Sequence, residues 1–182
     1  MKHNFFKIVA VLVFTILAVS TSFGQSSATD HQKVSATIIA PITITKNAEM
    51  NFGVVVPGAT TGTVVLTTGG SRSATGGTKV LTVQTGTVTA ATFDVTGEPA
   101  YTFAISLTNS SVTLTNTTGT GAETLLVDNF QSAAAAGTKG TLDGDGLQTL
   151  KFGATLNVGT KTTNVPGLYT NLSDFEVTVN YN

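Results

Sequence analysis

The sequence predicts an all-β protein, an antiparallel β-sandwich of about nine or ten short strands. Apolar residues recur at every second position over short runs, which is typical of strands with one face buried and one in water. Glycine and asparagine turns separate these runs at short intervals. The only alanine-rich run, Ala133 to Ala136, is too short for an isolated helix to be stable in water. A closed barrel would give the same pattern and remains the alternative architecture.

The C-terminal residues carry the clearest strand signal. Apolar side chains fall on every second position from Phe175, and polar residues stand between them. This alternation predicts a strand whose one face packs on a core. The apolar positions are Phe175, Val177, Val179 and Tyr181.

The remaining strands are expected at regular intervals along the chain, with Pro41 marking an edge or a bulge in the first of them. Glycine-rich loops are expected over residues 68–77 and 137–146. The expected strands lie within residues 34–45, 52–56, 63–67, 80–83, 88–95, 101–107, 112–114, 125–130, 147–158 and 169–181.

The N-terminus has the layout of a secretory signal peptide. Lys2 and Lys7 precede and flank an apolar run over residues 8–19, and small residues follow it. The run is shorter than the roughly 20 apolar residues that span a membrane, although a retained anchor is the alternative. We expect a signal peptide over residues 1–24, cleaved after Gly24.

Removal of this segment leaves a short polar stretch, residues 25–33, and a single β-sandwich domain over residues 34–182. Without Lys2 and Lys7, seven basic residues face ten acidic ones, so no basic surface of the nucleic-acid-binding kind is expected. Charged residues make up only 10% of the chain, against about 25% in ordinary globular proteins. The chain has no cysteine, so packing has to stabilise the domain without disulfides. We expect no membrane span after signal cleavage.

Residues able to support catalysis or metal binding are few. His31 lies in a polar segment near the expected processed terminus, where a solvated role is favoured over that of a catalytic base. Asp143 and Asp145 resemble part of a calcium loop, but the required glutamate is missing and Asp-Gly pairs favour hairpin turns. Arg72 could bind a carboxylate, although its glycine-rich flanks favour a solvated loop residue. The sequence therefore predicts no enzyme, no metal site and no cofactor.

Four segments, taken in order, resemble the bacterial domain-of-unknown-function family 4402, a relative of spore coat protein U and of pilin-like domains. Each segment alone is a weak signal, but the ordered set spans almost all of the expected mature chain. The segments are Pro41-Ile42-Thr43-Ile44-Thr45-Lys46 leading to Met50-Asn51-Phe52-Gly53, Ala91-Thr92-Phe93-Asp94-Val95-Thr96-Gly97-Glu98-Pro99, Phe152-Gly153-Ala154-Thr155-Leu156-Asn157-Val158-Gly159, and Gly167-Leu168-Tyr169 leading to Val177-Thr178-Val179-Asn180-Tyr181-Asn182.

The resemblance implies an immunoglobulin-like, pilin-like sandwich that is exported and has no established enzymatic activity. It also implies that relatives assemble by donor-strand exchange, with a periplasmic chaperone binding a C-terminal strand that ends in a penultimate tyrosine. Phe175, Val177, Val179 and Tyr181 match that pattern as a possible assembly strand. The chain departs from it in two respects: it lacks the usual cysteines, and only a polar segment precedes the first expected strand.

The expected function is that of an exported, non-catalytic structural or adhesion-related surface domain, of a pilus-like or coat-like kind. It would act in the periplasm, at the cell surface or outside the cell. The expected partners are other surface or pilus subunits or a periplasmic chaperone, and not nucleic acid. The alternative is a glycan- or ligand-binding module that uses the loops over residues 68–77 and 137–146. We expect the final strand to complete its own domain and partners to bind elsewhere.

Overall fold

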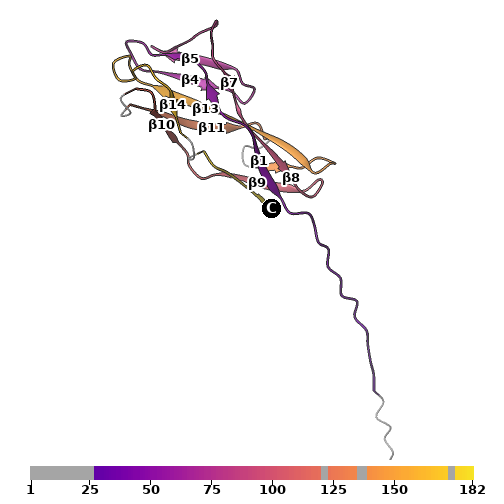
Figure 1. The fold of residues 1–182 in the computed structure, drawn as a ribbon. Coiled ribbons are helices and arrows are strands. Elements are labelled where there is room, and N and C mark those ends of the chain that lie inside the picture. Colours follow the sequence, from indigo (N-terminus) through magenta and orange to yellow (C-terminus); the bar gives the residue numbers. More distant parts are fainter. Residues whose placement is uncertain (1–26, 120–122, 135–138, 172–174) are drawn as a thin grey trace, which may run out of the picture. The chain divides into compact units, whose positions relative to one another are not determined.

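The computed structural model describes residues 27–119, 123–134, 139–171 and 175–182 (Figure 1). The chain divides into two compact units, residues 1–37 and residues 38–182. In the first unit, the described residues 27–37 form no helix or strand and are exposed. The expected signal peptide, residues 1–24, lies outside the described residues.

The second unit is all-β, and every strand pairing in its described residues is antiparallel. The larger of its sheets has eight strands, six of them in the order β1-β8-β13-β11-β10-β14, with β4 paired to β13 and β5 paired to β4. Its strands are β1 (Thr43–Ala48), β4 (Gly62–Leu66), β5 (Arg72–Gly76), β8 (Ala91–Thr96), β10 (Val112–Asn116), β11 (Thr124–Ser132), β13 (Leu147–Val158) and β14 (Tyr169–Thr170).

A three-stranded sheet, in the order β12-β9-β15, and two short ribbons complete the described fold. The ribbons pair β2 with β7 and β3 with β6. Figure 1 shows β4, β5 and β7 at one end of this unit and β1, β8 and β9 at the other. The bounds of these strands are β2 (Asn51–Phe52), β3 (Val55–Val56), β6 (Lys79–Val80), β7 (Val88–Thr89), β9 (Thr102–Leu107), β12 (Lys139–Thr141) and β15 (Val177–Tyr181).

Strand β13 connects the two ends of the domain. Along one edge it pairs first with β8, through residues 147–152, and then with β4, through residues 154–158. Its other edge pairs with β11 through residues 152–157. Every second side chain from its middle onward is buried on the same face, because successive residues of a strand point to opposite faces. The buried positions are Leu150, Phe152, Ala154, Leu156 and Val158.

The buried apolar residues form two clusters, which share the inner face of β13. The first core lies between β8, the beginning of β13 and the three-stranded sheet, and its members are Ala91, Val95, Phe103, Ile105, Ala134, Leu142, Leu150, Phe152, Val177 and Val179. The second core lies on β4, β10, β11 and the end of β13, with one residue of β2 packed on it, and its members are Phe52, Val64, Leu66, Val112, Leu125, Val127, Ala154, Leu156 and Val158.

The C-terminal alternation produces the strand that the sequence predicts. Strand β15 pairs with β9 over its whole length. Val177 and Val179 are each 8% exposed and belong to the first core, while Thr178 and Asn180 between them are exposed. The all-β antiparallel sandwich predicted from the sequence is confirmed, and β13 has the bounds that its alternation predicts.

Several strands differ in extent from the sequence-based expectation. Strand β1 begins at Thr43 rather than at residue 34, and the side chain of Ile38 is 96% exposed. Alternation alone was misleading here, because a strand also needs a hydrogen-bonding partner, and β8 pairs with β1 only from Thr43 onward. Half of the expected loop over residues 68–77 is strand β5 (Arg72–Gly76). The expected strand over residues 169–181 is two separate strands, β14 and β15.

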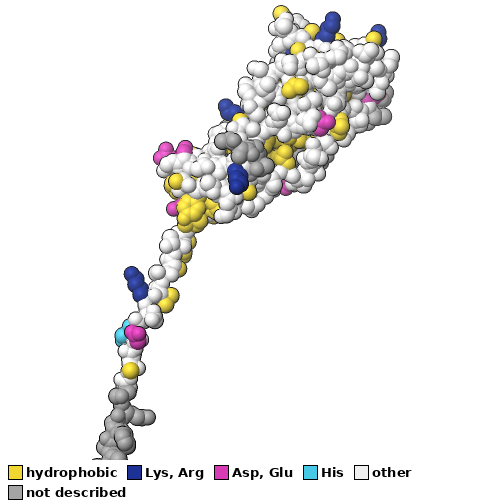
Figure 2. All heavy atoms as spheres, turned by 180° about the vertical axis from the view of Figure 1, so that it is seen from behind, with side chains coloured by type: hydrophobic (Ala, Val, Ile, Leu, Met, Phe, Trp, Pro, Cys, Tyr) yellow, Lys and Arg dark blue, Asp and Glu magenta, His cyan; other side chains and the backbone are white. Residues whose placement is uncertain are grey.

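Charged side chains are sparse on the described surface. Figure 2 shows isolated blue and magenta side chains on a mostly uncharged domain, with no patch of one sign on the face drawn. Polar contacts at the surface are made instead by threonine pairs, such as Thr43 with Thr96 at 2.6 Å and Thr63 with Thr75 at 2.7 Å. These cross-strand hydroxyl pairs contribute to the sheet pairing without any charge.

Replacing Phe152 tests whether β13 holds the domain together. Phe152 is 1% exposed, and its ring packs edge-on against the ring of Phe93, with the two ring centroids 5.8 Å apart. We expect Phe152→Ala to lower the free energy of unfolding by about 3–5 kcal/mol, because it leaves a cavity in the first core. Urea denaturation of the purified protein measures this. Lys151→Ala, on the exposed face of the same strand, should change it by less than about 0.5 kcal/mol; equal effects would contradict the role assigned to β13.

Candidate functional site

A groove of about 950 Å³ lies over the second core. One wall comprises residues 46–57, which run from the end of β1 through β2 and β3, and the opposite wall comprises residues 164–171 with Phe175. The side chains of the floor come from β10, β11 and β13: Val112, Leu114, Leu125, Val127, Leu156 and Val158. We call this the inter-wall groove.

The inter-wall groove exists because the second layer of the sandwich is incomplete at this end. The three-stranded sheet packs on the first core, and its members Val177, Val179, Phe103 and Ile105 all belong there. Over the second core, the described second layer contains only the short ribbons and the segment that leads to β15. In a complete sandwich, two facing sheets pack about 10 Å apart along their length. Among the described residues, no full facing strand lies above the strands of the floor.

The mouth of the groove is apolar. Leu168 is 60% exposed, Val54 43% and Val56 39%, and all three line the groove. The floor beneath them is deep, since Val127 and Leu156 are each only 3% exposed. Large apolar side chains gathered at the mouth of a cleft are typical of a surface that binds a partner or ligand.

A single arginine holds one wall of the groove in place. Strand β5 begins at Arg72, whose guanidinium group donates hydrogen bonds to backbone carbonyl oxygens of the wall and of the nearby loop. In the wall it donates to Phe52 and, at 2.9 Å, to Val54. In the loop between β6 and β7 it donates to Leu81 at 3.2 Å and to Thr85 at 3.3 Å. The expectation that Arg72 is a solvated loop residue is therefore wrong.

The wall approaches this guanidinium group so closely that it needs a glycine. Gly53 has a φ of 66°, a left-handed backbone conformation that glycine adopts most easily. A Cβ atom at this position would lie 2.4 Å from the carbonyl oxygen of Thr85 and 2.8 Å from Nη1 of Arg72. Gly53 and Arg72 together fix the path of the chain between β2 and β3.

Among the described residues that line the groove, only Lys46 and Glu49 are charged, and they pair with each other at 2.6 Å. The hydrogen bond and the charge of Lys46 hold the pKa of the Glu49 carboxyl below its usual value. Both side chains are exposed at the rim, so the pair contributes little to stability. The remaining polar residues of the lining are asparagines and threonines, so the groove is suited to an uncharged occupant that is largely apolar.

All four residues of the possible assembly strand pack against the domain's own cores, Tyr181 at the edge of the first. Val177 and Val179 lie in the first core, and Phe175 lies where the two cores meet, stacked on Phe130 with ring centroids 4.7 Å apart. Phe175 also lines the inter-wall groove. The structure therefore brings only the first of the four residues to the groove.

Tyr181 closes the other end of the domain. Its hydroxyl group accepts a hydrogen bond from the backbone N–H of Glu98 at 2.6 Å and donates one to the carbonyl oxygen of Ala40 at 2.9 Å. The Glu98 carboxylate in turn accepts the N–H of Ala40 at 2.9 Å. These three hydrogen bonds anchor the chain just before β1, so Ala40 is fixed to the end of β15.

Two residues considered for catalysis or metal binding, His31 and Asp143, lie at an exposed position and in a turn, respectively. His31 is exposed, and its backbone N–H donates to the Asp30 carboxylate at 2.8 Å. One oxygen of the Asp143 carboxylate accepts the N–H groups of Asp145 and Leu147, at 2.9 and 2.8 Å, as in a tight turn. In the part of the chain that the structure describes, no three His, Asp or Glu residues gather as metal ligands would.

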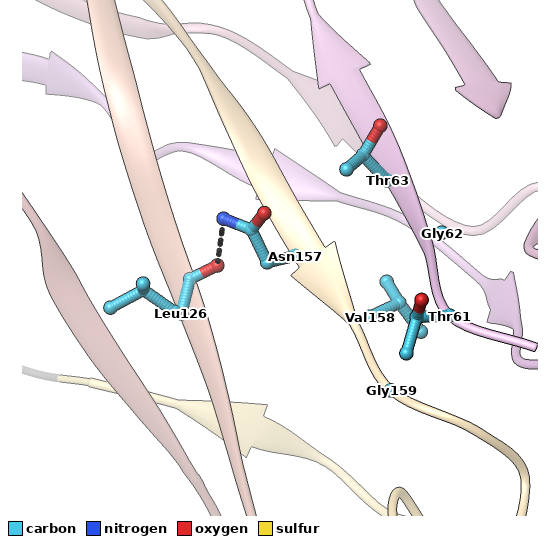
Figure 3. A pocket seen from close by; sticks show the side chains of 7 residues that line it. All are labelled: Thr61, Gly62, Thr63, Leu126, Asn157, Val158 and Gly159. Atoms are coloured by element: carbon cyan, nitrogen blue, oxygen red, sulfur yellow. Dashed lines mark hydrogen bonds between the residues drawn. The ribbon is translucent and has the colours of Figure 1, made fainter. Parts of the chain in front are cut away.

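A second, smaller hollow of about 320 Å³ lies beside β4 and β13 (Figure 3). It is lined by threonine, glycine and aliphatic residues together with Asn157, whose side-chain amide donates to the carbonyl oxygen of Leu126 at 3.3 Å. It contains no titratable side chain and offers no group for acid–base chemistry. The inter-wall groove is therefore the candidate site.

Fold and groove together define an all-β sandwich domain with an apolar groove in its second layer. A family model described as "Domain of unknown function (DUF4402)" matches residues 42–181. The chain belongs to this family. No curated protein and no solved structure matches the chain. Among the described residues, no helix has the length and apolar character that crossing a membrane requires.

Sequence reasoning did not find the groove. The sequence predicts only a strand over residues 52–56, because a compact apolar run gives no sign of which layer will cover it. Arg72 offered the only clue, since a single arginine in an almost uncharged chain is able to bind several carbonyl oxygens at once.

Replacing Arg72 tests how the wall of the groove is held. We expect Arg72→Lys to lower the free energy of unfolding by about 2–4 kcal/mol, because an ammonium group cannot reach four carbonyl oxygens and charge-assisted hydrogen bonds contribute about 1.5–3 kcal/mol each. Urea denaturation gives the value. Lys79→Ala, at a position exposed on β6, serves as the control and should be near neutral. Stability unchanged in Arg72→Lys would show that these hydrogen bonds do not hold the wall.

Proposed function

We propose that this protein is an exported, non-catalytic structural or adhesion-related surface domain that binds a partner through an extended apolar segment placed in the inter-wall groove. The observation that carries the proposal is the groove itself, which has a floor of aliphatic strand residues and large apolar side chains at its mouth. The domain would then act as an assembly module of a pilus-like or coat-like kind.

An extended peptide suits the groove better than a compact ligand does. The floor consists of strand residues that point to one face, such as Val112 and Leu114 on β10 and Leu125 and Val127 on β11. These side chains are spaced at every second residue, so they match the spacing of side chains on a facing strand.

Strand edges beside the groove favour the same interpretation. Strand β15 ends the three-stranded sheet, and it begins two residues after Phe175 in the groove wall. An edge strand presents unpaired N–H and C=O groups, to which an added strand can bind. Main-chain hydrogen bonds would supply affinity, and apolar side chains in the groove would supply specificity.

Export is proposed from the sequence. The leader-like residues 1–24 and the absence of cysteine suit a domain that folds outside the cytoplasm on packing alone. The non-catalytic role is proposed because the described groove offers only the mutually paired Lys46 and Glu49 as titratable groups, and both lie at its rim. Binding through the expected loops loses support, because Arg72 is already engaged with four carbonyl groups.

Peptide binding tests the proposed use of the groove. The probe is a fluorescent eight-residue peptide with valine and threonine at alternate positions, and a matched peptide has aspartate at two valine positions. We expect saturable binding of the first peptide only, measured by fluorescence anisotropy. Leu168→Glu, at the exposed mouth, should weaken it at least fivefold because it places a charge among apolar side chains.

Leu126→Glu provides the matched control for this experiment. Leu126 is 42% exposed and lies on the outer face of β11, adjacent in sequence to the groove residue Leu125. Its substitution should leave peptide binding unchanged. Failure of the valine–threonine peptide to bind, or equal losses in Leu168→Glu and Leu126→Glu, would overturn the proposed use of the groove.

Export is tested on protein produced with its own leader in a Gram-negative bacterium. We expect N-terminal sequencing of the protein recovered from the cell envelope or the medium to begin at Gln25, because small residues precede that position. Recovery in the cytoplasm with residues 1–24 attached would overturn the exported role.

A further inference from the structure

We propose that the smaller hollow beside β4 and β13 binds one unit of a neutral, linear glycan, whose chain continues across the outer face of the eight-stranded sheet. We call this hollow the outer hollow. It lies on the opposite face of the sheet from the inter-wall groove, because Leu156 of the groove and Asn157 of the hollow are successive residues of β13. The outer hollow is therefore a second binding site, independent of the groove.

The outer hollow forms where the pairing of β4 with β13 ends. The last pair is Gly62 with Val158, and both residues line the hollow together with Thr61 and Gly159 just beyond them. Figure 3 labels all the lining side chains. The volume of about 320 Å³ lies at the lower end of the range for small-molecule sites, roughly 300–1,000 Å³. Such a volume suits one sugar ring.

The polar groups of the outer hollow are able both to donate and to accept hydrogen bonds. Threonine hydroxyls do both, and Thr61 and Thr63 line the hollow. The side-chain amide of Asn157 uses one N–H for the carbonyl oxygen of Leu126, and no other described residue bonds to this amide. Its second N–H and its own carbonyl oxygen are left for a ligand. Sugar hydroxyl groups, which also donate and accept, are complementary to this set.

The register of the sheet places these side chains in one row across four strands. Leu126 lies opposite Asn157, Asn157 opposite Thr63, and Thr63 opposite Thr75. Neighbouring strands are about 4.8 Å apart, so the row presents a side chain at each such step. One hexose unit of an extended glycan has a similar length. Successive sugar units can therefore meet successive side chains of the row.

An apolar contact is present beside these polar groups. The side chain of Leu126 is 42% exposed and lines the outer hollow. A sugar ring carries C–H groups on its faces, and covering them with an aliphatic side chain removes apolar area of both from water. Leu126 thus provides the contact that hydroxyl and amide groups cannot.

The charges around the outer hollow favour a neutral glycan. None of the residues that line it is charged. The next outward-facing residue along β11 is Asp128, which lies opposite Thr155 in the adjacent row. Its negative charge would repel the carboxylate or sulfate groups of an acidic glycan.

A protein strand is not suited to this face. Strands β11, β13 and β4 each pair with a neighbour on both sides. Their backbone N–H and C=O groups are therefore engaged, and an added strand would find no free edge. Only side chains are offered to a ligand, as sugar recognition through hydroxyl groups requires.

Calorimetric titration of the purified protein tests the inference. The probes are three neutral linear glycans, cellohexaose, mannohexaose and hexa-N-acetylchitohexaose, and the matched acidic glycan is hexagalacturonate. We expect saturable binding of at least one neutral glycan and no binding of hexagalacturonate.

Variants of the row locate the binding site. Asn157→Ala and Thr63→Val should each weaken glycan binding roughly fivefold, because each removes hydrogen-bonding groups from the hollow. Thr45→Val is the matched control, since Thr45 is exposed on β1, outside the hollow, and its substitution should leave the affinity unchanged. Urea denaturation checks that each variant is folded.

Two further variants separate the outer hollow from the inter-wall groove. Leu126→Glu should weaken glycan binding about fivefold or more, because it replaces the apolar contact with a charge, and should leave binding of the valine–threonine peptide unchanged. Leu168→Glu should do the reverse, since Leu168 lines only the groove.

Three outcomes would overturn the inference. The first is that none of the three neutral glycans binds. The second is an equal loss of affinity in Thr63→Val and Thr45→Val, and the third is binding of hexagalacturonate as tight as that of the neutral glycans. Peptide binding without any glycan binding would overturn the glycan site and leave the proposed use of the groove standing, whereas glycan binding without peptide binding would do the opposite.

Discussion

The inner face of β13 is the constraint on which the rest of the domain depends. A strand places every second side chain on the same face, so Leu150, Phe152, Ala154, Leu156 and Val158 must all be buried together. The buried residues of the three-stranded sheet pack only on the first core, so this sheet covers part of the face. The first core receives β9 and β15 as its cover, and the second core receives only short ribbons. The inter-wall groove follows from this incomplete cover.

The wall of the groove is stabilised by hydrogen bonds rather than by sheet pairing. Ribbons of two residues per strand contribute little by themselves, since isolated two-stranded pairs are marginal in water. Arg72 compensates by binding carbonyl groups of the wall and of the loop beside it. A wall held in this way keeps a defined position even when no facing strand is present. The groove is thus a built feature of the domain and not a loosely packed region.

Much of the fold could be predicted from local patterns. Strands β13 and β15 follow their alternation because each has long-range partners that bury the apolar face, and Asp143 forms the turn that its glycine neighbours favour. The candidate site could not be predicted in the same way. Residues 34–42 alternate like a strand and form none, since no neighbour pairs with them, and Arg72 stands among flexible residues yet makes four hydrogen bonds.

The sequence by itself determined the all-β class, the antiparallel arrangement and the main strands, because the period of side chains along a strand is a local property. It also determined that no disulfide contributes, since no cysteine is present. Only the tertiary structure decided which apolar faces are covered and which remain open. That outcome depends on pairings between residues far apart in the chain, such as Thr43 with Thr96 and Leu66 with Ala154. Local periodicity carries no information about such pairings.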